Sequence, residues 1–144
     1  MSTPIPAEVE EYLRLIEGDS PRACKDQHAL AAYVRGVFAR EELTVDREQL
    51  DRYLSLTRYF DFPQLFPWEA FLLALWDCTY TQDGVPRWPE LFCLVGRGAG
   101  KDGFIGFDGF CCISPYHKTG HYDVDICAFI VTIFVLWLLT IKAC

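Results

Sequence analysis

Apolar residues recur every three or four positions through the first part of the chain, which is the pattern of amphipathic helices. The pattern predicts a helix over 7–17, ended by Gly18, and a second helix over 28–42. Asp46 with Gln49 three residues later resembles a capping box and predicts the start of a third helix. We therefore expect an all-helical N-terminal part whose outer face is acidic and solvated.

The pattern changes after Asp61, where short apolar runs alternate with turn residues. It predicts a helix over 66–76, a turn over 81–86, a strand over 91–95, a helix over 104–113 and a strand over 122–127. The run 91–95 is apolar without a break, which is typical of a strand buried on both faces. A strand, a glycine-rich turn, a helix and a second strand form the opening of a parallel α/β sheet. The predicted fold class is therefore α/β.

The glycine turn, residues 96–103, carries the most informative chemistry in the sequence. It reads Gly96, Arg97, Gly98, Ala99, Gly100, Lys101, Asp102 and Gly103. Glycines let the backbone close on an anion, and the N-terminus of the following helix favours negative charge. A lysine at the end of such a loop adds a positive charge for a terminal phosphate. The pattern indicates a P-loop that binds nucleotide phosphates.

The turn meets the strict P-loop pattern only in part. Gly100 and Lys101 are in place, but Val95 occupies the first glycine position and Asp102 the hydroxyl position. The hydroxyl normally holds magnesium beside the phosphates. An aspartate there could bind the metal, yet it would also repel the nucleotide. The alternative interpretation is a strand-to-helix turn whose glycines serve only its tight geometry.

A dinucleotide-binding motif overlaps the same residues. Gly98, Gly100 and Gly103 match G-x-G-x-x-G, and Asp123 follows at the spacing of a ribose-binding acid. However, that acid should end the second strand, whereas Asp123 falls near the start of one. Lys101 also suits a terminal phosphate better than a pyrophosphate. The P-loop interpretation is therefore preferred.

The cysteines and the composition narrow the class of protein. Of 144 residues, 51% are hydrophobic and the net charge is −7, which fits a single domain with a real core. No basic stripe is present, so the chain alone is a poor candidate for binding DNA phosphates. Seven cysteines without a C-x-x-C pair favour free thiols in a reducing compartment. A zinc cluster of Cys111, Cys112, His117 and His121 matches the spacing of no usual zinc module.

Taken together, these segments resemble the N-terminal part of a bacteriophage terminase large subunit, the motor that packages phage DNA. The resemblance spans about residues 10–127, and its order and spacing are specific although each piece alone is weak. The residues that carry it lie in the segments Tyr12–Gly18, Ala23–Lys25, Phe66–Phe71, Leu91–Lys101 and Tyr122–Ile126.

The resemblance implies a P-loop ATPase that uses ATP and Mg²⁺. Lys101 and the backbone of 97–100 would contact the phosphates, and Asp102 remains a departure that leaves metal binding open. Trp68 and Glu69 lie where the family places its adenine-contacting segment, although Trp68 would equally serve as a core aromatic at a helix start. The implied partners are the terminase small subunit, the portal protein and double-stranded DNA, in the cytoplasm of a bacterial host.

Two parts of such a motor have no counterpart in this sequence. The second acidic strand end, an apolar run followed by Asp-Glu, is missing, and so is the nuclease domain with its carboxylates for two metals. We therefore assign no catalytic residue. We expect a truncated prophage motor that binds nucleotide at most and neither hydrolyses ATP nor cuts DNA.

The resemblance stops where the sequence becomes almost wholly apolar. Residues 126–141 contain only Thr132 and Thr140 as polar members, and a helix of this length would span about 24 Å, short of a ~30 Å hydrocarbon core. Three interpretations remain: an out-of-frame tail, a membrane anchor of a small protein without enzymatic activity, or a buried strand or helix. The expected organisation is a helical preface over 1–60, the start of an incomplete P-loop sheet over 61–127 and the tail over 128–144.

Overall fold

The computed structural model describes residues 3–18, 23–62, 64–96, 98–117, 122–131 and 134–143, with side chains up to His117. The chain divides into two compact units. Unit 1 comprises Met1–Leu50 and Leu65–Pro89, and unit 2 comprises Asp51–Gln64 and Glu90–Cys144. The division at Leu50 falls inside one helix, α3 (Arg47–Leu56), and each unit is described by itself.

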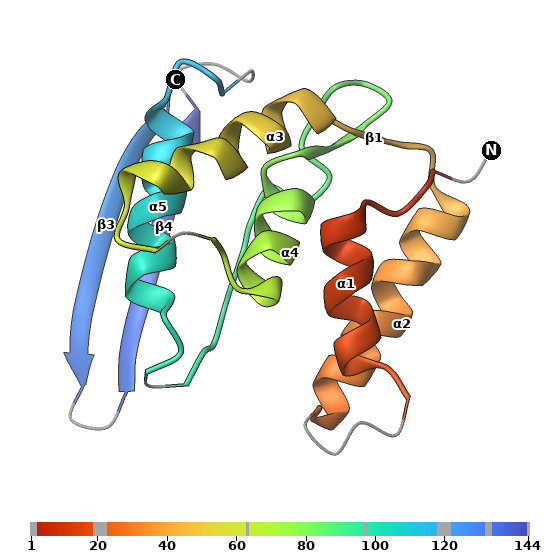
Figure 1. The fold of residues 1–144 in the computed structure, drawn as a ribbon, viewed down its shortest axis with the longest axis horizontal. Coiled ribbons are helices and arrows are strands. Elements are labelled where there is room, and N and C mark those ends of the chain that lie inside the picture. Colours follow the sequence, from red (N-terminus) through yellow and green to blue (C-terminus); the bar gives the residue numbers. More distant parts are fainter. Residues whose placement is uncertain are drawn as a thin grey trace. The chain divides into compact units, whose positions relative to one another are not determined.

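Unit 1 is a small helical assembly with one short sheet. It contains α1 (Ala7–Ile16), α2 (Lys25–Arg40), β1 (Leu43–Val45), α4 (Pro67–Trp76) and β2 (Thr79–Thr81). Helix α1 packs against both α4 and α2 (Figure 1). The predicted helices over 7–17, 28–42 and 66–76 are confirmed to within a few residues. Their apolar faces supply the buried side chains Val9, Leu13, Ile16, Ala31, Val34, Val37, Phe38, Phe71, Leu73, Ala74 and Leu75.

Arg35 ties α2 to α1 by ion pairs. Its Nη1 lies 2.9 Å from Glu10 Oε2, and its Nη2 lies 2.7 Å from Glu17 Oε2. The Nε of Arg35 also donates to Glu17. Glu10 additionally pairs with Arg14 one turn along α1. These charges lower the pKa of both carboxyl groups, chiefly through the hydrogen bonds from Arg35.

The short strands β1 and β2 pair antiparallel, with Leu43 opposite Thr81. Neither strand is predicted by the sequence, which has only three residues in each to show a pattern. The turn predicted over 81–86 is confirmed: Gly84 has φ +77° and its N–H donates to Thr81 O at 3.0 Å.

The Asp46 side chain caps the start of α3, as predicted. Asp46 Oδ1 accepts from the Gln49 N–H at 2.9 Å, as the capping-box pattern requires. The Gln49 Nε2 donates to Asp77 O at 2.8 Å and to Tyr80 Oη at 3.1 Å, and Gln49 is fully buried. This glutamine therefore joins α3 to the α4–β2 segment.

Unit 2 is built around α5 (Lys101–Ile113), a 3₁₀ turn η1 (Thr57–Tyr59), β3 (Tyr122–Val131) and β4 (Phe134–Ala143). Helix α5 packs against β3 (Figure 1). Phe60 and Phe62 place their rings edge-on to Phe107 of α5, with centroids 5.3 and 5.8 Å apart. Phe60 also meets Phe110 in the same way. This aromatic cluster joins the chain before α4 to the helix after the glycine turn.

The buried strand predicted over 91–95 is wrong in this structure. The segment has no strand pairing, and Phe92 and Leu94 are each 75% exposed. A strand satisfies its backbone only by pairing with a neighbour, and no strand within the described residues pairs with this segment. The apolar run alone could not reveal that.

The apolar tail forms a β-hairpin. β3 and β4 pair antiparallel, from Tyr122 opposite Ala143 to Val131 opposite Phe134. The strand predicted over 122–127 is therefore confirmed and longer than expected. No helix among the described residues is long and apolar enough to cross a membrane. The fold is mixed α and β, as predicted at that level, and both sheets of the described chain are two-stranded and antiparallel.

Candidate functional site

The glycine turn contains two residues in the left-handed region of backbone conformation. Gly98 has φ +81° and Gly100 has φ +83°. Residues with a side chain rarely adopt this backbone conformation, because it costs a non-glycine residue about 1–2 kcal/mol. The Ala99 N–H reaches back to Gly96 O at 3.4 Å. The backbone of this turn therefore favours glycine at both positions.

The turn leads directly into α5. Gly100 occupies the N-cap position, and its carbonyl accepts from the Phe104 N–H at 3.1 Å. Lys101 is the first helical residue and Asp102 the second. The first N–H groups of any α-helix have no partner within the helix and carry partial positive charge. The turn therefore ends at the electropositive N-terminus of α5.

The two charged residues at this end differ in exposure. The Lys101 side chain is 13% exposed and that of Asp102 is 68% exposed. Lys101 Nζ lies 3.8 Å from Asp102 Oδ1, at the long end of an ion pair. The carboxylate occupies a position beside Lys101 that a bound anion would compete for. A ligand phosphate would have to share or displace this contact.

The structure keeps Gly98, Ala99, Gly100, Lys101 and Asp102 together as one continuous turn and helix start. Arg97, the remaining predicted phosphate contact in the turn, lies outside the described residues. The sequence signal for this part of the site was local, because φ and the start of a helix depend on adjacent residues. For that reason the turn geometry could be anticipated without tertiary structure.

Trp68 and Glu69 belong to unit 1, whereas the glycine turn belongs to unit 2. Glu69 is only 5% exposed, and its Oε2 accepts from the Phe66 N–H at 2.8 Å, capping the start of α4. Burial raises the pKa of this carboxyl group. Trp68 is half-buried in the first turn of the same helix. Both residues thus have a structural place in α4, and their contact with adenine stays a prediction.

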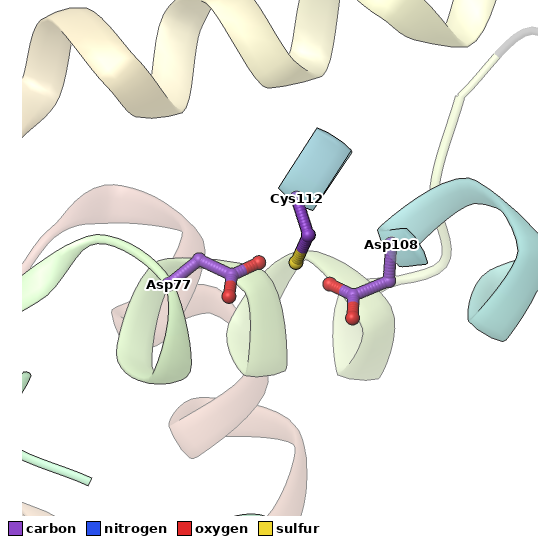
Figure 2. Close-up of side chains that lie close together, drawn as sticks. All are labelled: Asp77, Asp108 and Cys112. Atoms are coloured by element: carbon purple, nitrogen blue, oxygen red, sulfur yellow. The ribbon is translucent and has the colours of Figure 1, made fainter. Parts of the chain in front are cut away.

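A buried acid and a buried thiol lie one turn apart on α5. Asp108 and Cys112 are 1% and 2% exposed and project from the same side of the helix, as Figure 2 shows. Asp77, also drawn there, follows the last turn of α4 in unit 1 and is buried too. The sequence pattern assigns Asp108 and Asp77 no role, because burial of an acid has no local signature. Within unit 2 the pair offers one oxygen and one sulfur ligand, fewer than the usual four of a structural zinc site.

The four residues of the disfavoured zinc cluster are Cys111, Cys112, His117 and His121. Cys111 and Cys112 are both buried on α5, and neither forms a disulfide. His117 Nδ1 shares a hydrogen bond with Tyr53 Oη, and the two rings are stacked with centroids 6.2 Å apart. Burial lowers the pKa of His117 below its ordinary value of 6.5. His121 lies outside the described residues, so the four-ligand set is not seen.

The geometry defines a mixed α/β protein in which a glycine-rich turn opens a helix at a lysine. Among known proteins, no family model, no curated protein and no solved structure matches this chain. Function is therefore inferred from the residues and geometry of the turn.

Proposed function

We propose that this chain is a truncated N-terminal part of a phage terminase large subunit that retains a deviant P-loop. The turn 97–102 would bind the phosphates of ATP, without hydrolysing it. One observation carries the proposal: two glycines with positive φ, Gly98 and Gly100, lie in the turn that leads into a helix whose first residue is Lys101. Glycine backbone, helix N-terminus and lysine are the three features that a phosphate-binding loop combines.

The position of Lys101 supports the assignment chemically. Its side chain is mostly buried, at 13% exposure, although a lysine in the first helical turn adds nothing favourable to the helix dipole. A cation at the positive end of a helix is stabilised when an anion binds beside it. A nucleotide phosphate would supply that anion and would hydrogen-bond to the first N–H groups of α5.

Asp102 shapes the metal chemistry of the proposed site. Its exposed carboxylate is an oxygen ligand of the kind that Mg²⁺ prefers. It also brings a negative charge close to the phosphates, which a divalent cation would offset. We therefore infer that ATP would bind with Mg²⁺ in preference to free ATP, with Asp102 in the place of the usual hydroxyl residue.

The segment before the turn supports the idea of an incomplete sheet. Leu91–Val95 is apolar and forms no strand, and its Phe92 and Leu94 are each 75% exposed. An exposed apolar run of this kind is unusual on a soluble surface. In an intact motor, neighbouring parallel strands would cover it. The small subunit, the portal protein and double-stranded DNA would be partners of that intact motor rather than of this acidic chain.

Nucleotide binding is tested by thermal unfolding of the full chain with ATP and Mg²⁺. Ligand at about 100 times its Kd should stabilise the folded chain by about 2.7 kcal/mol, which raises the Tm by several degrees. Lys101→Ala should abolish the shift. Lys25→Ala is the matched control, because Lys25 is also the first residue of a helix, α2. It should leave the shift intact.

Three results would contradict the proposal. An absence of any shift with ATP and Mg²⁺ would remove nucleotide binding. An equal shift in the wild type and in Lys101→Ala would place the ligand elsewhere. Stabilisation by NAD instead of ATP would favour the dinucleotide interpretation of Gly98, Gly100 and Gly103.

The truncation is tested at the level of the gene. The DNA around and beyond codon 127 should be translated in all three frames. An alternative frame that continues the resemblance and reaches an apolar run ending in Asp-Glu would support a broken packaging motor. A downstream sequence without such a frame would contradict it and leave the β3–β4 hairpin as an integral part of the protein.

A further inference from the structure

We draw no further inference here: the strongest candidate, the exposed apolar segment Leu91–Val95 that precedes the glycine turn, carries nothing because nothing in the structure shows what covers it.

Discussion

Gly100 lies at the start of α5 and Gly106 lies within it, and we expect alanine to have opposite effects on stability at these two positions. Gly100 caps α5 with φ +83°, whereas Gly106 lies within α5, where a Cβ would meet no atom within 4 Å. Gly100→Ala should lower the free energy of unfolding by about 1–2 kcal/mol, because the left-handed conformation strains alanine. Gly106→Ala should raise it by about 1 kcal/mol, because alanine favours a helix. Urea unfolding measures both, and effects of the same sign would contradict the described turn.

His117 gives the chain a pH dependence that can be isolated. Because burial lowers its pKa below 6.5, the folded chain favours the neutral ring. Its contribution is fully present above that ordinary pKa and is lost as the pH falls through the lower pKa of the folded state. We expect wild-type Tm to fall between about pH 7 and pH 5 more steeply than the Tm of His117→Gln.

Tyr53→Phe is the matched control for this pH dependence. It removes the hydroxyl that bonds His117 but keeps an aromatic ring beside the imidazole. Since burial rather than the hydroxyl lowers the pKa, the steep pH dependence should persist in this variant. Parallel Tm curves for the wild type and His117→Gln would contradict the lowered pKa of His117.

At the scale of elements, we expect the ion pairs of Arg35 to stabilise the packing of α2 against α1. It pairs with Glu10 and Glu17, and its side chain is 36% exposed. Arg35→Met keeps most of the stem and removes the charge, so it should lower the Tm by a few degrees. Since the pKa values of Glu10 and Glu17 are lowered, the ion pairs contribute above the ordinary value of 4.5 and lose their effect as acid protonates both groups. The difference between wild type and variant should therefore shrink in acid.

Arg14→Met is the control for the α1–α2 ion pairs. Arg14 pairs with the same Glu10 but within α1, and its side chain is 75% exposed. Exposed pairs of this type contribute little, so the Tm should hardly change. An equal loss in both variants would show that the ion pairs to Arg35 do not join the helices.

At the scale of the whole molecule, the exposed segment Leu91–Val95 governs solubility rather than stability. Phe92→Ser with Leu94→Ser should change the free energy of unfolding by no more than about 0.5 kcal/mol, because both side chains are three-quarters exposed. The double variant should bind less hydrophobic dye and aggregate less. Phe107→Ala, at a fully buried position, should cost about 3–5 kcal/mol. A comparable loss of stability in the double variant would contradict the exposure of these side chains and would favour the buried strand predicted from the sequence.

The sequence by itself determined the features that depend on neighbouring residues. Among the helices of the described residues, α1 and α2 follow from apolar periodicity, α4 and α5 from apolar segments bounded by turn residues, and α3 from its Asp46 cap. The glycine turn follows from residues whose φ is a local property. The proposed phosphate contacts at 98–102 needed no more than this, which is why they could be named in advance.

Only the tertiary structure decided how extended segments are used. A strand requires a partner, so the sequence could not tell that 91–95 pairs with no strand of the described residues while the apolar tail pairs with itself as β3 and β4. Burial is likewise a property of the whole fold. In the folded chain Glu69 is a buried helix cap, the Gln49 side chain donates to Asp77 and Tyr80, and Asp108 is buried. Periodicity describes one chain segment at a time, whereas pairing and burial depend on segments distant in sequence.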